Sequence, residues 1–293
     1  MILQNSSLDS IITGAGLTSY LQFPVAVDVP ALLQEYAAGR VRLNSPRPNV
    51  TDAADANPIG ENPDPNGLYV VRGPTSAVAI QPVRGVIVAG ASKRQEEFYG
   101  LWNLDRIHSA VAAVAADPTI SGLVLQMDTP GGSVLGLRAA ADALLSLQDQ
   151  RPDVSVLSYA QRLNASAGMY LAAATQAFHA APGAYVGSIG TIAALTDYTG
   201  LKEKFGITTK VYTADSTLKD LGRGPITEAH DNHMKAMVKT YSDEFKGWMQ
   251  ERRGVEPGSM HGQAWEARMA PAGITDSTAF VTFQEFLATA LGL

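Results

Sequence analysis

Three short stretches of this sequence carry residues that could do covalent chemistry. Ser166 lies among small residues in the segment from Asn164 to Tyr170, and Lys219 follows 53 residues later. A turn with two consecutive glycines, within residues 128–133, precedes both. A hydroxyl nucleophile needs a base to take its proton and donors to stabilise the oxyanion that it creates. The ordered trio could supply all of these, and it predicts a hydrolase that uses a serine and a lysine.

The glycine-rich turn follows an apolar stretch. Glycine leaves the backbone N–H groups of such a turn without a side chain in front of them. An uncovered N–H can approach a carbonyl oxygen closely and stabilise the charge of a tetrahedral intermediate. The alternative is a tight connection between a strand and a helix, with no part in chemistry. The turn reads Asp128-Thr129-Pro130-Gly131-Gly132-Ser133.

Ser166 follows a predicted strand and begins a predicted Ala-rich helix. This position exposes the hydroxyl near the positive end of a helix and leaves the Ala167 N–H free as an oxyanion donor. The alternative is a helix N-cap, which is a common place for serine. The leading glycine of a Gly-x-Ser-x-Gly elbow is absent, because Asn164 stands there.

None of the histidines considered is well placed as the base of Ser166. His179 is only 13 residues downstream, in a predicted strand, and His261 lies in a later loop. His230 and His233 belong to a long charged helix, where a solvated face is a simpler interpretation than a metal site.

Lys219 is the better candidate for the base. It lies just past a predicted strand and before the long helix. A lysine acts as a base only where burial or neighbouring dipoles lower its pKa. The alternative is a surface lysine paired with Asp220.

Composition limits the kind of protein this can be. Apolar residues make up 46% and charged residues 17% of the 293 residues, which suits a globular chain with ample core material. The net charge of −6 argues against a nucleic-acid partner. The absence of cysteine excludes disulfides, zinc–thiolate sites and a cysteine nucleophile. Neither a secretory signal nor an apolar run long enough for a membrane anchor is recognisable, so we expect a soluble intracellular protein.

The sequence divides into three predicted parts. Residues 1–43 form an amino-terminal extension with a short strand at 23–27 and a helix at 31–36. Residues 44–76 are a linker rich in Pro and Asn, whose composition cannot bury much apolar surface. A compact domain is expected over residues 77–293.

Strands and helices alternate through this domain, which predicts an α/β fold with its chemistry at the carboxyl ends of the strands. Strands are expected at 78–83 and 85–88, as a pair, and at 122–127, 154–159, 185–195 and 208–212. Helices are expected at 102–116, from the glycine turn through 144, at 166–177, as a long amphipathic helix over 225–252, and near 262–270 and 280–291.

Five motifs in the right order resemble the signal-peptide peptidase A (SppA) family of Ser-Lys peptidases, which are relatives of ClpP. The resemblance covers roughly residues 77–293. The motifs are the turn at Asp128 to Gly132, the nucleophile segment at Ala165 to Tyr170, Gly187-Ser188-Ile189-Gly190, Lys219-Asp220-Leu221, and the late segment from Gly262 to Trp265 and Gly273 to Asp276.

This resemblance implies a role for each candidate residue. Ser166 would be the nucleophile and Lys219 the general base, and Gly132 and Ala167 would supply the N–H groups of the oxyanion hole. Ser188 would hydrogen-bond the lysine amine and orient it. Neither a metal nor a cofactor is implied. The implied fold is ClpP/crotonase-like, with repeated strand-strand-helix units in a homo-oligomeric ring.

Among relatives of this kind, a chain without a membrane anchor and with an extra amino-terminal segment is similar to the capsid-maturation proteases of tailed phages. That resemblance implies a scaffold or capsid precursor as the polypeptide substrate, in the host cytoplasm or inside the procapsid. A cytoplasmic SppA-like bacterial peptidase is the alternative. A crotonase-type acyl-CoA enzyme and a catalytically silent scaffold ring are further alternatives.

Overall fold

The computed structural model describes residues 63–72, 77–214 and 218–291. Its centre is a seven-stranded sheet with the order β1-β2-β5-β6-β8-β9, in which β7 also pairs with β6. The inner strands run parallel, and β1 and β9 are antiparallel edges. The strands are β1 (Tyr69–Arg72), β2 (Ala77–Arg84), β5 (Ile120–Thr129), β6 (Ser155–Ala165), β7 (Ala177–Ala180), β8 (Tyr185–Gly187) and β9 (Ala264–Glu266).

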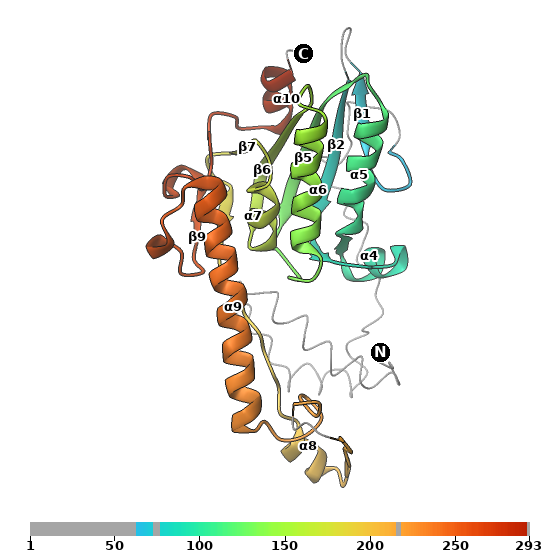
Figure 1. The fold of residues 1–293 in the computed structure, drawn as a ribbon, viewed down its shortest axis with the longest axis vertical. Helices are drawn as coiled ribbons and strands as arrows, with labels where there is room; N and C mark the ends of the chain where they lie inside the picture. The colour runs from blue at the N-terminus through green and yellow to red at the C-terminus, as the bar shows by residue number, and fades with distance from the viewer. Residues whose placement is uncertain (1–62, 73–76, 215–217, 292–293) are drawn as a thin grey trace, which may run out of the picture.

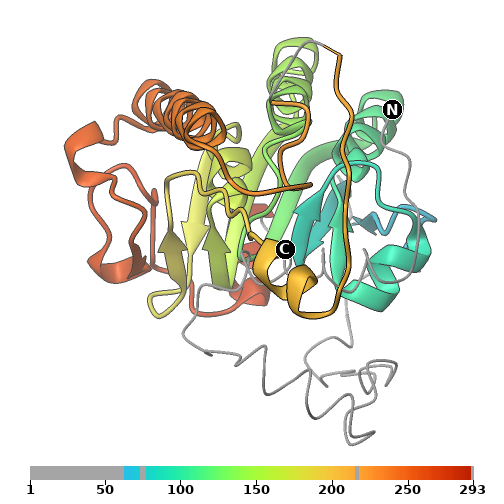
Figure 2. The same ribbon diagram turned by 90° about the horizontal axis from the view of Figure 1, so that it is seen from below.

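Helices cover both faces of this sheet (Figures 1 and 2). On one face lie α5 (Asp105–Ala116), α6 (Leu137–Gln150), α7 (Ala167–Ala172) and the carboxyl-terminal part of α9 (Glu228–Arg253). On the other face α10 (Phe283–Leu291) packs against β6, where the rings of Phe286 and Tyr159 stack with 5.0 Å between centroids. The predicted α/β class is therefore confirmed.

Burial explains why the central strand forms where the sequence predicts it. Leu123, Val124 and Leu125 are consecutive and fully buried, so β5 is covered on both faces. Parallel strands inside an α/β sheet have this continuous apolar character.

A second, small sheet lies beside the main one. It consists of β3 (Val86–Val88) and β4 (Leu101–Asn103), which run parallel, with α4 (Lys93–Tyr99) between them in sequence. Ile87 of β3 also forms a parallel bridge with Gly132, beyond the end of β5. The predicted strand-strand-helix unit is seen in β2, β3 and α4. Strand β6 changes its partner along its length: its first half pairs with β7, and its last three residues pair with β8.

The predicted pairing of strands 78–83 and 85–88 is wrong. β2 pairs with β1 and β5, whereas β3 pairs with β4. Only Gly85 separates the two strands, and one residue cannot make a hairpin. Its φ of +91° bends the chain from one sheet to the other, and a Cβ there would lie 2.2 Å from the Gly100 oxygen. β1 and α4 were not predicted from the sequence, and residue 102 belongs to β4 rather than to a helix.

Several boundaries differ from the prediction because tertiary contacts end the elements early. β8 stops at Gly187, where φ is +116°. α7 stops at Ala172, and Thr175 then donates its hydroxyl to the Ala172 oxygen at 2.7 Å. The stretch 208–212 is exposed and pairs with no strand among the described residues, so it is not a strand. Residues 264–269 form β9 and a 3-10 turn (Ala267–Met269) instead of a helix, because β9 pairs with β8.

The predicted long helix is confirmed as α9, and its first half extends beyond the sheet (Figure 1). Thr227 caps its start, and Gly254, at φ +65°, ends it. The core contacts come from Phe245, Trp248 and Met249 near the carboxyl-terminal end. At the far end of α9 lies α8 (Thr199–Lys204), within residues 191–227, which we call the arm.

The strand predicted at 23–27 and the helix predicted at 31–36 lie outside the described residues, and the proposed three-part division stays a prediction. A short 3-10 helix, Pro257–Ser259, follows α9. Within the described part of the chain, no helix combines the length and apolar character needed to cross a bilayer.

Candidate active site

Ser166 stands at the junction of β6 and α7 in an unusual backbone conformation. Its φ of +51° and ψ of −119° lie outside the regions that residues other than glycine normally adopt. Such strain costs about 1–3 kcal/mol and persists only where surrounding contacts enforce it. The Ser166 N–H donates to the Gly187 oxygen at 2.8 Å, which ties the junction to β8. Ser166 occupies the N-cap position of α7, but its side chain makes no capping hydrogen bond.

The glycine turn packs directly against this junction. A Cβ on Gly131 would lie 2.5 Å from the Ser166 Cβ and 2.9 Å from the Ala167 nitrogen, so only glycine fits there. Gly131 also has a φ of +102°. The turn and the start of α7 are therefore in contact, although 35 residues separate Gly131 from Ser166.

The bridge to β3 orients the next residue of the turn. The Ile87 N–H donates to the Gly131 oxygen at 2.9 Å, and the Ser133 N–H donates to the Ile87 oxygen at 2.8 Å. In a parallel ladder this pattern directs the N–H of the intervening Gly132 away from Ile87. Ala167 is the first residue of α7, so its N–H has no partner within the helix. Two backbone donors thus lie on adjoining segments beside Ser166.

Two buried polar side chains support these segments, and no role was predicted for either of them from the sequence. The Thr129 hydroxyl donates to the Gly85 oxygen at 2.7 Å and accepts from the Gly131 N–H at 3.0 Å. Asn164 is fully buried, and its Nδ2 lies 3.5 Å from the Met169 sulfur. A Cβ on Gly168 would lie 2.1 Å from Asn164 Oδ1, so this amide fills the space under the first turn of α7. A threonine at the start of a glycine turn is a recognisable signal for such a hydroxyl bond.

Ser188 joins the same group of segments. It follows Gly187, whose oxygen accepts from the Ser166 N–H, and its own N–H donates to the Gln263 oxygen at 2.7 Å. Its φ of +54° is the second positive value at a non-glycine residue in the described chain. The structure therefore brings Gly132, Ser166, Ala167 and Ser188 into one neighbourhood.

Lys219 lies elsewhere, on the arm. Its neighbour Asp220 accepts a hydrogen bond from His230 near the start of α9, where Asp220 Oδ1 and His230 Nε2 are 2.8 Å apart. Phe245, which packs on Tyr170 of α7, comes 15 residues after His230, and that length of helix spans about 22 Å. Within this single copy, the structure does not bring Lys219 to Ser166.

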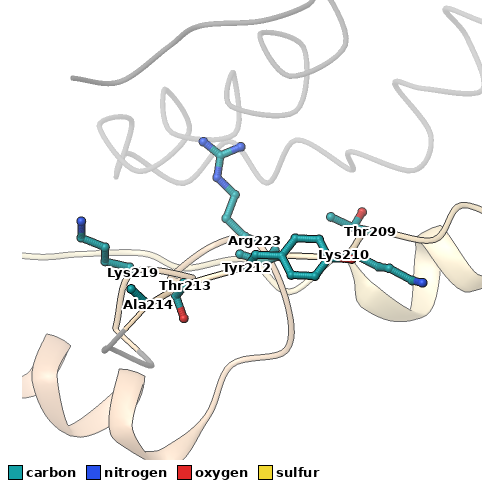
Figure 3. A pocket seen from close by; sticks show the side chains of 8 residues that line it. Thr209, Lys210, Tyr212, Thr213, Ala214, Lys219 and Arg223 are labelled. Atoms are coloured by element: carbon teal, nitrogen blue, oxygen red, sulfur yellow. The ribbon is translucent and has the colours of Figure 1, made fainter.

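The surroundings of Lys219 are open and cationic. Lys210, Lys219 and Arg223 line a hollow of about 500 Å³ with Tyr212. Figure 3 shows Lys219 and Arg223 extending on the same side of the arm, with Thr213 pointing the other way. Lys219 is exposed and has no ion pair with another described residue. In this copy Lys219 is a surface lysine, as the alternative expected, but the expected pairing with Asp220 is absent because Asp220 bonds to His230 instead.

The histidines also differ from the simplest interpretation. His230 is 1% exposed, so the prediction of a solvated position is wrong for it, whereas His233 is exposed. The His230 Nδ1 accepts from the Thr227 N–H, which leaves Nε2 as the donor to Asp220.

Burial lowers the pKa of His179, with Arg253 acting in the same direction and Asp276 opposing it.

Comparison with known proteins shows that part of this region is similar to a known family. Residues 148–281 match the model of Peptidase family S49. Capsid assembly protease C of Escherichia phage lambda is 33% identical over 132 residues, which are 45% of this chain and 29% of that protein. Head-tail preconnector protein GP5 of Enterobacteria phage P21 is 27% identical over 197 residues, which are 66% of this chain and 34% of that protein.

Residues 148–281 are thus similar to Peptidase family S49, and the predicted resemblance to SppA-type peptidases is confirmed. The matched stretch contains Ser166, Ser188 and Lys219, whereas the glycine turn precedes it. This chain spans about a third of the length of the two phage relatives. Among solved structures, a membrane-bound stomatin-specific protease in complex with a substrate peptide superposes with a TM-score of 0.44 and 16% identity, over 75% of this chain and 83% of that one.

Proposed function

We propose that this chain is a serine endopeptidase in which Ser166 attacks the scissile carbonyl and an uncharged Lys219 takes the serine proton. The Gly132 and Ala167 N–H groups bind the resulting oxyanion. Collapse of the tetrahedral intermediate transfers the proton to the leaving amine and leaves an acyl group on Ser166. Lys219 then deprotonates a water molecule, which releases the acyl product and restores the serine. Ser188 accepts a hydrogen bond from the lysine amine and orients it.

The strained conformation of Ser166 is the observation that carries this proposal. A serine that only capped α7 would have ordinary dihedral angles and a bond to the helix amides, and Ser166 has neither. Strain of this kind gathers at active sites, where it aims a reacting group. The contact of Gly131 with the Ala167 nitrogen supports the same conclusion, because it sets two backbone donors beside the hydroxyl.

The position of Lys219 leads us to propose that the pair of catalytic residues forms only on assembly. The arm that carries Lys219 exposes large apolar side chains, among them Phe205 at 74% and Tyr212 at 87%. Such a surface favours contact with another molecule. We propose that the chain forms a homo-oligomeric ring in which the arm of one copy brings Lys219 to Ser166 of its neighbour.

For the substrate we propose a scaffold or capsid precursor, in the host cytoplasm or inside a procapsid. The two phage relatives support this choice through what they are named for, capsid assembly and the head-tail connector. A cytoplasmic SppA-like peptidase that degrades peptides is the alternative, and it would act through the same residues.

The test is covalent labelling combined with two single variants. A serine-directed phosphonate should label wild-type protein at Ser166, and Ser166→Ala should abolish both labelling and peptide cleavage. Lys219→Ala should lower cleavage by at least about a thousandfold, the scale on which loss of a base acts. Cleavage that persists unchanged in both variants would support a structural ring, and absent labelling would favour an acyl-CoA enzyme.

A further inference from the structure

A cavity of about 450 Å³ lies between α6, α7 and α9, the helices that lie side by side on one face of the sheet (Figure 1). This volume is within the range of sites that hold small ligands or single side chains. Its apolar wall includes Val134, Leu137 and Phe245, and its charged residues are Arg138, Asp142 and Glu244. The cavity therefore combines an apolar body with a charged rim.

Three of its walls come from the segments that carry the candidate active site. Val134 lies two residues after Gly132, and Thr191 lies three residues after Ser188. Tyr170 also lines the cavity, and its N–H donates to the Ser166 oxygen at 3.2 Å. If a polypeptide substrate is bound at Ser166, a substrate side chain close to the scissile bond can therefore reach this cavity.

The charges of the rim do not balance. The Arg138 Nε donates to Asp142 Oδ1 at 2.8 Å, and the guanidinium lies 4.8 Å from the centre of the Trp248 ring. Arg138 is thus held by Asp142 and Trp248. No ion pair within the described chain involves Glu244, so two carboxylates and one guanidinium leave one negative charge. Burial raises the pKa of Tyr170, and Glu244 and Asp142 act in the same direction while Arg138 opposes them.

We propose that this cavity receives a lysine or arginine side chain of the polypeptide substrate, with the aliphatic stem along Val134, Leu137 and Phe245 and the cation beside Glu244. Long basic side chains bury their methylene groups against apolar surface while the charged end stays near water and an opposite charge. The cavity thereby selects basic residues near the scissile bond. This inference rests on the proposed peptidase function.

The experiment compares fluorogenic peptides that differ at one position near the scissile bond, where lysine, norleucine or glutamate is placed. Norleucine keeps the stem and lacks the charge. For the wild type, kcat/KM should be about three- to fivefold higher with lysine than with norleucine, as expected for a partly exposed ion pair. Glu244→Gln should remove this difference, and Glu244→Lys should move the preference to glutamate. Glu251→Gln, on an exposed part of α9 outside the cavity, is the matched control and should keep the lysine preference.

Phosphonate labelling of Ser166 separates the two proposals. Every Glu244 variant should label as fast as the wild type, because the residue is not part of the reacting group. Normal labelling together with no lysine preference in the wild type, or with a preference that survives in Glu244→Gln, would overturn the cavity assignment alone. A wild type that neither labels at Ser166 nor cleaves any peptide would overturn both.

Discussion

At the scale of single residues, the chain places unusual conformations and buried polar groups where two segments meet. Ser166 and Ser188 have positive φ values, and each donates its backbone N–H to a different strand or loop. The side chains of Thr129 and Asn164 fill the space under the first turn of α7, next to Ser166. These contacts hold the backbone donors beside Ser166 in one arrangement, as an oxyanion site requires.

His179, which lies apart from this site, is expected to make the stability of the fold depend on pH. His179 lies on β7 against the rings of Phe280 and Phe286, with a buried Nδ1 that has no hydrogen bond among the described residues. Its pKa in the folded state is lowered, chiefly by burial. The unfolded chain therefore binds a proton below about pH 6.5 that the folded chain takes up only at lower pH. The free energy of unfolding should fall as the pH drops through this window.

The measurement is urea unfolding at pH 7.5, 6.5 and 5.5. The decrease in the free energy of unfolding should be smaller than ~1.4 kcal/mol per pH unit, which is the slope when the unfolded chain binds one whole proton more than the folded chain. His179→Phe keeps the ring and removes the titration, so the pH dependence of its unfolding should be weaker. His108→Phe, at an exposed position of α5, should behave like the wild type. An unchanged dependence in His179→Phe would contradict this assignment.

At the scale of elements, the two ends of α9 make different contacts. Its carboxyl-terminal end is fixed by Trp248, whose indole donates to the Tyr170 oxygen at 3.0 Å, and by ring contacts with α7. Its amino-terminal end holds the arm through Thr227, His230 and Asp220. Because the arm is attached to the amino-terminal end of this long helix, Lys219 lies well away from the sheet.

His230 is therefore expected to set the local order of the arm. His230→Ala removes one half of the capping box and the bond to Asp220, and loss of a cap costs about 1 kcal/mol. Amides of residues 218–231 should exchange with deuterium about fivefold faster, while those of β5 stay unchanged. His233→Ala, one turn along the exposed side, is the control. Equal exchange in the two variants would show that His230 does not hold the arm.

At the scale of the whole molecule, the sheet with its helices and the arm are distinct surfaces. The exposed apolar residues of the arm have no partner surface within the described part of this copy. A second copy that covered them would bury this surface and complete the proposed pair of catalytic residues.

Mixing inactive variants tests this assembly. Ser166→Ala retains Lys219, and Lys219→Ala retains Ser166, so neither should cleave peptide alone. If neighbouring copies share a site, a mixture allowed to exchange subunits should recover about a quarter of wild-type activity, the fraction of ordered pairs that carry both groups. Ser166→Ala mixed with the double variant should recover none. No recovery from an exchanged mixture would mean that each arm serves its own serine.

Features that depend on neighbouring residues could be predicted from the amino-acid sequence alone. The buried strand β5 followed from a continuous apolar run, and the long helix α9 from its periodicity. The glycine turn and the position of Ser166 between a strand and a helix also followed from local chemistry. The side chains within such an element determine whether it forms a helix or a strand, so it can be predicted from the sequence pattern without knowledge of the fold.

The contacts between these elements could not be predicted and became visible in the three-dimensional fold. It set Gly131 against Ala167, gave β8 a place beside the second half of β6, buried His230 under the arm and kept Lys219 apart from Ser166. Each of these results depends on packing between segments far apart in the chain. Their energies come from contacts and hydrogen bonds that no local pattern encodes. For this reason the strand predicted at 185–195 ends at Gly187 and the stretch 208–212 forms no strand, whereas the central elements were confirmed.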